Sequence, residues 1–279
     1  MKLLYLGTAA AEGQPALFCT CATCRTARER GGRDLRTRSQ ALLDGRLLLD
    51  FPPDTLAHTL REGIDLSEIS DCLLTHTHTD HLYPDDFENR VSGYSKVGDH
   101  IFTLRGSAGA LAYTEKRIAP YRERMCAFRT APLTLYETTA VGDFSVTALP
   151  ALHDPASDPV IYLIGNGEGK HLLYAHDTGF FEDDVFHFLK ERGVHLDLVS
   201  LDCTYGQRES ARGGGHHMNL AENRRVRERL LSLGIADGTT VFVSNHFSHN
   251  GKGVLYDEFS AAAQADGILM SYDGMTVEV

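Results

Sequence analysis

The stretch LLTHTHTDHL, residues 73–82, places four metal-binding side chains directly after an apolar segment: His76, His78, Asp80 and His81. In extended backbone, residues two apart point to the same side, so His76 and His78 can converge on one metal ion. Asp80 and His81 follow closely enough to reach a neighbouring ion. Imidazole and carboxylate together suit zinc, manganese or iron. The alternative is a solvated histidine-rich loop, but four ligand-type residues in six positions behind a buried strand are rarely accidental.

Other apolar segments also end in polar, metal-capable residues. LLLD ends at Asp50, LLYAHD at Asp177 and VFVSNH at His246. Sites are commonly assembled where strands end at one edge of a sheet. The alternative is that strands simply become polar where they leave the core. That would explain one or two of these cases but fits the whole set poorly. The pattern therefore predicts a site at a sheet edge.

The apolar pattern predicts a mixture of short strands and helices. Strands are expected at 3–7, 39–51, 71–75, 144–151, 159–165, 170–177, 196–204 and 239–246, and helices at 55–61, 183–192, 219–233 and 255–265. Asp44-Gly45 is a favoured two-residue hairpin turn. Asn219 and Glu222 have the spacing of a capping box at the start of a helix.

The composition is that of an ordinary globular protein, with 42% hydrophobic and 23% charged residues among 279. We expect one domain over residues 1–279. The net charge of −11 argues against nucleic acid or anionic membranes as partners. No apolar run approaches the ~18 residues of a membrane span. The N-terminal apolar run is too short for a signal peptide, which predicts a cytoplasmic protein whose cysteines bind metal or fill the core.

The motif His-x-His-x-Asp-His resembles the hallmark of the metallo-β-lactamase superfamily, and later family elements follow in the expected order. The resemblance runs from about residue 40 to 250 and implies an α/β fold, a four-layer αββα sandwich with metals at one edge. It implies one metal held by His76, His78 and His153, a second held by Asp80, His81 and His246, and Asp177 as the bridge between them. Each later assignment has a competitor. His153 could be a surface residue, His176 adjoins Asp177, and His249 lies three residues after His246.

Two metal ions about 3.5–4 Å apart can activate a hydroxide and hold both oxygens of an in-line displacement at phosphorus. The same centre also suits ester, thioester or lactone hydrolysis. A histidine is the best candidate to protonate the leaving oxygen. The Gly-rich segment GGGHHMNL offers His216 and His217, of which we favour His217. We therefore predict Asp80, Asp177 and His217 as catalytic residues.

Three of the six cysteines, Cys19, Cys21 and Cys24, lie at C-x-C-x-x-C spacing and are one ligand short of a tetrahedral zinc site. Reduced thiols in a loop are the alternative. The cluster resembles the subgroup that includes the phosphoribosyl cyclic phosphodiesterases, which implies a structural zinc with His249 as the fourth ligand. A pyrroloquinoline quinone biosynthesis protein shares a similar cluster but departs from the full histidine motif. A closed site of this kind would tie the N-terminal loop to the segment carrying His246.

The sequence as a whole predicts a metal-dependent hydrolase. We expect a phosphodiesterase for a small cyclic or nucleotide-like phosphodiester, with two catalytic Mn²⁺ or Zn²⁺ ions and one structural Zn²⁺. The expected partner is this small molecule, and related enzymes suggest a homodimer by analogy. The rivals are an ester, thioester or lactone hydrolase on the same metals, and a non-catalytic metal- or ligand-binding relative.

Overall fold

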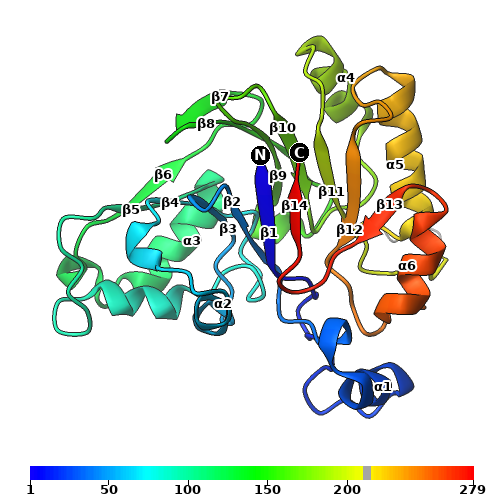
Figure 1. Cartoon of the computed structure of the whole chain (residues 1–279). Coiled ribbons are helices and arrows are strands. Elements are labelled where there is room, and N and C mark those ends of the chain that lie inside the picture. Colours follow the sequence, from blue (N-terminus) through cyan, green and yellow to red (C-terminus); the bar gives the residue numbers. More distant parts are fainter. Residues whose placement is uncertain (210–214) are drawn as a thin grey trace.

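The computed structural model describes residues 1–209 and 215–279 of the chain. Within these residues, two seven-stranded sheets pack face to face and helices cover their outer faces (Figure 1). This confirms the predicted four-layer αββα sandwich.

The first sheet has the strand order β14-β1-β2-β3-β4-β5-β6. Its strands are β1 (Lys2–Gly7), β2 (Gln40–Leu43), β3 (Leu47–Leu49), β4 (Asp71–Leu73), β5 (Phe102–Gly106), β6 (Phe128–Pro132) and β14 (Thr276–Glu278). Pairing is antiparallel from β14 to β3 and parallel from β3 to β6. The β2–β3 hairpin turns at Asp44-Gly45, both with positive φ, as the sequence indicates. Leu43 pairs with Leu47, however, so the loop has three residues rather than two.

The second sheet has the order β13-β12-β11-β10-β9-β8-β7. Its strands are β7 (Thr138–Val141), β8 (Phe144–Pro150), β9 (Val160–Gly165), β10 (His171–Ala175), β11 (Leu198–Asp202), β12 (Val241–Asn245) and β13 (Ile268–Met270). The strands from β10 to β13 are parallel, so the carboxyl ends of β10, β11 and β12 meet at one edge. This edge carries much of the site described below.

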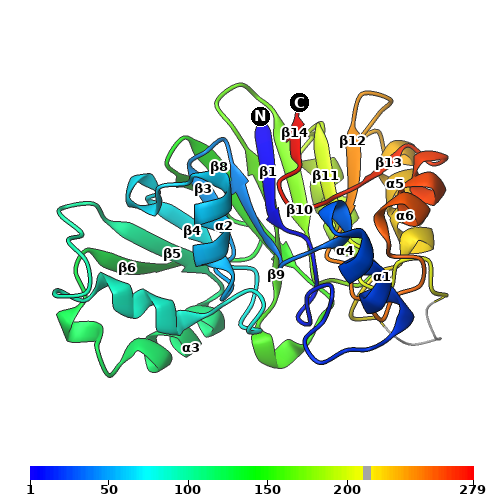
Figure 2. The same cartoon turned by 60° about the horizontal axis from the view of Figure 1, so that its bottom comes forward.

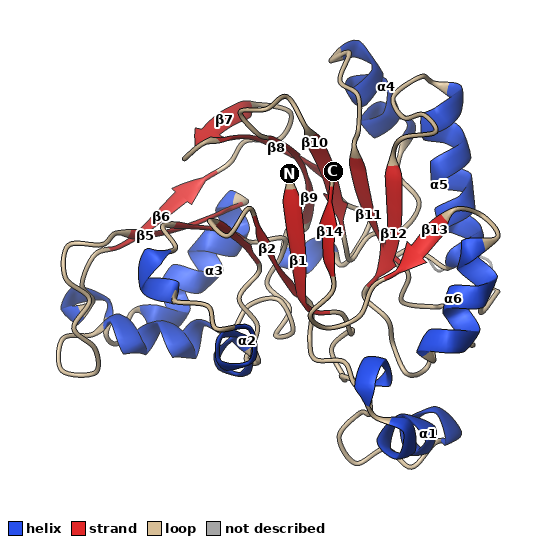
Figure 3. Cartoon of the chain, viewed as in Figure 1, coloured by secondary structure: helices blue, strands red, loops and turns tan. Residues whose placement is uncertain are grey.

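The two outer layers consist of helices α2 (Thr55–Glu62), α3 (Ala108–Ile118), α4 (Asp183–Glu191), α5 (Leu220–Ser232) and α6 (Tyr256–Gln264) (Figure 3). Helix α1 (Ala22–Arg30) lies apart from both layers. Buried residues such as Tyr5, Tyr162 and Tyr174 fill the space between the sheets. One outer hydrophobic core lies between the second sheet and helices α4, α5 and α6. Another lies between the first sheet and α3. The predicted capping box of Asn219 and Glu222 is present at the start of α5.

Helix α1 lies outside the two-sheet body, beyond the end of β1 (Figures 1 and 2). The sequence pattern did not predict it, because only Cys24 and Ala27 of its nine residues are buried and no apolar stripe exists. Its first turn is instead capped by Cys21, whose side chain accepts a hydrogen bond from the backbone N–H of Cys24. The pattern also missed α3 and the strands β5, β6, β7, β13 and β14. Several of these are short, and β6 and β7 are edge strands with exposed positions.

Across the described parts of the chain, none of the helices has both the length and the apolar character needed to cross a membrane.

Candidate metal centre

Three residues at strand ends have left-handed backbone conformations. Asp50 follows β3 with φ of 67°, Asp177 lies just beyond β10 with φ of 49°, and His246 follows β12 with φ of 62°. Non-glycine residues seldom adopt such conformations, and those that do concentrate at functional sites. All three residues are at least 98% buried. The strained strand ends therefore mark the sheet edge where the predicted ligands meet.

The first ligand group consists of His76, His78 and His153. The Nε2 atom of His153 lies 3.0 Å from the Nδ1 atom of His78. The Nε2 atom of His76 is buried and has no hydrogen-bond partner among the described residues. His76 and His78 follow β4 of the first sheet, whereas His153 follows β8 of the second. The structure thus brings together the three histidines that the motif resemblance grouped.

The second ligand group consists of Asp80, His81, Asp177 and His246. The Nε2 atoms of His81 and His246 face each other at 3.1 Å. Asp177 Oδ2 contacts His81 Nε2 and lies 3.2 Å from His246 Nε2, while Asp80 Oδ2 lies 3.4 and 3.5 Å from the same two nitrogens. Asp177 Oδ2 is also 3.4 Å from His76 Nε2, so this one carboxylate touches both groups.

The donor set fits divalent cations. Imidazole nitrogens 3.0–3.1 Å apart repel each other unless a proton or a metal lies between them, and the buried His76 Nε2 has no hydrogen-bond partner among the described residues. Burial alone would lower the pKa of His246, but the carboxylate of Asp177, with Asp202 and Asp80, outweighs it and raises this pKa to about 10. Burial would likewise raise the pKa of Asp177, but the imidazoles of His246 and His81 hold it well below its usual range. The carboxylates therefore stabilise positive charge at this position, which a divalent metal would supply.

The outer nitrogens of the site histidines are held by neighbouring groups. His81 Nδ1 lies 2.7 Å from Asp50 Oδ2, and Asp50 Oδ1 accepts hydrogen bonds from the backbone N–H and hydroxyl of Thr75. His246 Nδ1 lies 2.9 Å from the hydroxyl of Thr204. Such partners fix the ring orientation and tautomer of a metal-binding histidine. The sequence pattern did not indicate Thr75 or Thr204, because a single hydroxyl residue carries no recognisable spacing.

The two competing histidines of the Gly-rich segment occupy different positions. His217 Nδ1 lies 3.0 Å from Asp202 Oδ2 and 3.2 Å from Asp177 Oδ1. His216 is exposed, and its backbone carbonyl accepts from His153 Nδ1 at 3.1 Å. Burial would lower the pKa of His217, but the carboxylate of Asp202 raises it. Residues 213 and 214 of this segment lie outside the described residues.

Asp202 was missed in the sequence, although it ends β11 at the same sheet edge as the other strand-end residues. Its position as the last residue of an apolar strand was the available signal. The neighbouring competitor His176 does not join a ligand group. It is fully buried, its Nε2 lies 2.7 Å from the hydroxyl of Ser200, and burial lowers its pKa well below the usual range. The structure therefore places Asp177 rather than His176 among the ligand-type side chains.

The cysteine cluster comes together as the fourth-ligand interpretation expects. Cys19, Cys21, Cys24 and His249 form one group, and His249 Nδ1 lies 3.7 and 3.6 Å from the sulfurs of Cys19 and Cys21. Tetrahedral zinc with a Zn–S bond of about 2.3 Å and a Zn–N bond of about 2.0 Å requires a separation of about 3.6 Å. The hydrogen bond from the Cys24 backbone N–H lowers the pKa of Cys21 to about 6, which favours the thiolate form that binds metal. Cys72 and Cys203 are buried core residues.

A cavity of about 360 Å³ lies apart from these groups. Phe51, Phe87 and Phe102 are among the residues that line it, and none of the candidate metal ligands does. We therefore assign it no part in the metal chemistry.

Comparison with solved structures finds the same fold over the whole chain. A Zn²⁺-bound PqqB from Methylobacterium extorquens is 21% identical, with a TM-score of 0.72 and 100% of both chains covered. A diphosphatase of the PhnP family is 21% identical, with a TM-score of 0.73 over 100% of this chain and 96% of that one. Human tRNase Z, short form, is 17% identical, with a TM-score of 0.66 over 100% and 99% of the chains. Among curated protein sequences, none matches this chain significantly.

A family model described as the beta-lactamase superfamily domain matches residues 45–234, which include the histidine motif, His153, Asp177 and His217. A match over more than half of the chain, together with the αββα fold and the clustered ligands, decides the family. This fold implies divalent metal binding, and most members of the group are metal-dependent hydrolases. The chain belongs to the metallo-β-lactamase superfamily.

Proposed function

We propose that the chain is a metal-dependent phosphodiesterase acting on a small cyclic or nucleotide-like phosphodiester. The observation that carries this proposal is the position of Asp177. One of its oxygens lies 3.4 Å from His76 of the first ligand group and contacts the second group, while the other lies 3.2 Å from His217. A carboxylate shared by two ligand groups, with a separate imidazole beside it, suits transfer at phosphorus.

Each ligand group would hold one Mn²⁺ or Zn²⁺ ion. We assign His76, His78 and His153 to the first ion, Asp80, His81 and His246 to the second, Asp177 to both, and Cys19, Cys21, Cys24 and His249 to a structural zinc. When bound, the two catalytic ions would activate a water molecule and neutralise negative charge on the phosphoryl group. The carboxylates of Asp80 and Asp177 would partly balance the positive charge of these ions.

His217 is the proposed proton donor to the leaving oxygen. Its Nδ1 atom is held by Asp202, which leaves Nε2 as the nitrogen available to a substrate. The negative charge of Asp202 stabilises the protonated ring, and Thr204 lies 3.1 Å from the same Nδ1 atom. The His217 side chain keeps 20% of its surface exposed, more than any of the proposed catalytic-metal ligands except His78, so it can approach a bound substrate.

The comparisons support chemistry at phosphorus without choosing the substrate. One structural neighbour is a diphosphatase and another is a tRNase. The chain's net charge of −11 favours a small anionic substrate drawn to the metal centre over a long nucleic acid. We also propose that the chain is a single cytoplasmic domain that forms a homodimer.

The test compares substrate classes with one Mn²⁺- or Zn²⁺-loaded preparation. Bis(p-nitrophenyl) phosphate, a five-membered cyclic phosphodiester and a diphosphate are assayed beside thioester and lactone panels. We expect turnover of the phosphodiesters and its loss in Asp177→Asn. Activity on a thioester or lactone with none on any phosphodiester would overturn the proposal.

A further inference from the structure

The loop that joins β8 to β9 places a carboxylate beside a candidate metal ligand. Asp154 Oδ2 lies 3.3 Å from His78 Nε2, while the other ring nitrogen of His78 faces His153 at 3.0 Å. An imidazole that binds a metal through one nitrogen carries its proton on the other. With Nδ1 turned to the ligand group, His78 Nε2 is the donor and Asp154 is the acceptor.

The second oxygen of Asp154 fixes its own loop. Asp154 Oδ1 accepts from the backbone N–H of Ala156 at 3.0 Å, and the hydroxyl of Ser157 donates to the Asp154 carbonyl at 2.7 Å. These bonds close the short 3₁₀ turn η5 (Pro155–Ser157). One carboxylate therefore orders the loop with one oxygen and faces His78 with the other.

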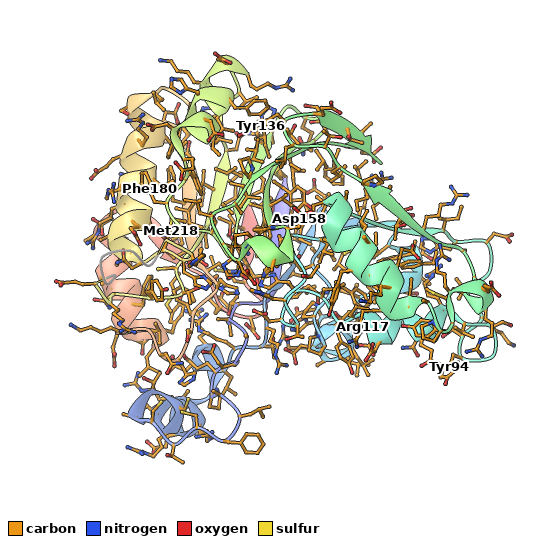
Figure 4. The ribbon with its side chains drawn as sticks, turned by 180° about the vertical axis from the view of Figure 1, so that it is seen from behind. Tyr94, Arg117, Tyr136, Asp158, Phe180 and Met218 are labelled. Carbon is orange, nitrogen blue, oxygen red and sulfur yellow. The ribbon has the colours of Figure 1, made fainter. Side chains whose placement is uncertain are left out.

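The far end of the loop is anchored to the first sheet's helix layer. Asp158 accepts from the backbone N–H of Gly109 at 2.9 Å and, through its carbonyl, from the hydroxyl of Ser107 at 2.8 Å. Ser107 is the N-cap of α3, and Figure 4 shows Asp158 between η5 and α3. A side chain at Gly109 would overlap the Asp158 carboxylate, so the contact depends on a glycine there. The loop is thus held at both ends where the two sheets meet.

This arrangement matters because the first ligand group draws on both sheets. His78 follows β4 and His153 follows β8. Asp154, the residue after His153, contacts the ring of His78 and so links the two strand ends. The partner of His81, Asp50, is fully buried, whereas the Asp154 side chain is 49% exposed. A substitution at Asp154 can therefore alter the His78 contact without opening the core.

We propose that Asp154 is a positioning residue that accepts the hydrogen bond of His78 Nε2 and so directs His78 Nδ1 toward the metal it shares with His76 and His153. The inference rests on the proposed assignment of His78 as a metal ligand.

Two variants of Asp154 separate this contact from the loop turn. In Asp154→Asn the side-chain oxygen still caps Ala156, but an amide N–H₂ replaces the acceptor facing His78. In Asp154→Ser the hydroxyl can cap the turn and is too short to reach His78. Asp158→Asn is the matched control, because it removes the same charge from the same loop without touching His78. Melting curves of the three metal-free variants check that each one folds.

Metal affinity is measured by competition with a chromophoric chelator, and imidazole N–H exchange by proton NMR of the Co²⁺-substituted protein. We expect both Asp154 variants to bind one catalytic ion 10–100-fold more weakly, with faster solvent exchange of one imidazole proton, while Asp158→Asn matches the wild type. Wild-type affinity and exchange in a folded Asp154→Asn protein would overturn this inference alone. A wild-type protein that binds no divalent metal through His78 would overturn the proposed function as well.

Discussion

The Oδ2 atom of Asp202 lies 3.0 Å from the Nδ1 atom of His217, at the end of β11 and beside the shared carboxylate. Asp202 is fully buried, and its other oxygen accepts from the backbone N–H of Met218 at 2.8 Å. Both oxygens of Asp202 are therefore held, which fixes the orientation of the Asp202–His217 pair. In Figure 4, Met218 lies at the start of α5, so the helix and the strand together hold His217 in place.

Replacement of His217 should lower the turnover rate most for substrates whose leaving group must be protonated. For His217→Asn we expect turnover of an alkyl or ribose-like phosphodiester to fall about 10²–10⁴-fold, the usual range for a lost general acid. The p-nitrophenolate group leaves without protonation, so bis(p-nitrophenyl) phosphate should lose less than about 10-fold. Steady-state kinetics with both substrates measure the difference. Equal losses on both would show that His217 does not donate the proton.

Replacement of Asp202 should also lower turnover most for substrates with a poor leaving group, but by a smaller factor than replacement of His217. The His217 imidazole remains, but Asp202 no longer fixes its orientation or stabilises its positive charge. We expect Asp202→Asn to reduce kcat for the poor leaving group about 10–100-fold, with metal content unchanged. Metal analysis of the same preparation checks the second point. A loss of metal equal to the loss of activity would instead make Asp202 a ligand, as its proximity to His246 permits.

Loss of one cysteine of the cluster should remove the structural zinc ion and thereby lower the stability of the fold. Cys21→Ser is expected to lower the zinc content from three ions to two per chain, with the protein loaded with zinc throughout. It should also lower Tm by several degrees, because a metal bound only by the folded state stabilises it. Cys126→Ser is the matched control, since Cys126 is a partly buried thiol outside the cluster. Normal folding with all zinc retained in Cys21→Ser would contradict the cluster's assignment.

Much of the site could be predicted because its ligands concentrate in one motif and at strand ends. His76 to His81 stand within six positions, and Asp177 and His246 end apolar strands. Asp202 ends a strand too, but the predicted strand ran on to residue 204 and so placed this aspartate inside it. Thr75 and Thr204 act through single hydroxyls whose partners are far away in the sequence. The polar sequence of α1 has no apolar period, because its residues depend on the cysteine cluster rather than on a core.

A buried histidine away from the metal centre should make stability depend on pH. His58 on α2 is fully buried, and its Nδ1 lies 2.6 Å from the Gln40 side-chain oxygen. Burial, together with the positive charge of Arg61, lowers its pKa to about 4. The folded protein then keeps His58 neutral, while the unfolded chain binds a proton as the pH falls through about 6.5. Stability from this group is therefore complete above about pH 6.5 and declines from there to about pH 4.

We expect the free energy of unfolding to lose about 2 kcal/mol through His58 between pH 7.5 and pH 5. Other ionisable groups contribute to the pH dependence as well, so the quantity to measure is the difference between wild type and His58→Gln. Urea unfolding of both metal-free proteins at the two pH values gives it directly. His187→Gln, which replaces an exposed histidine of α4, should keep the wild-type pH dependence. If the His58→Gln protein lost as much stability on acidification as the wild type, His58 would not be the neutral buried group that its surroundings indicate.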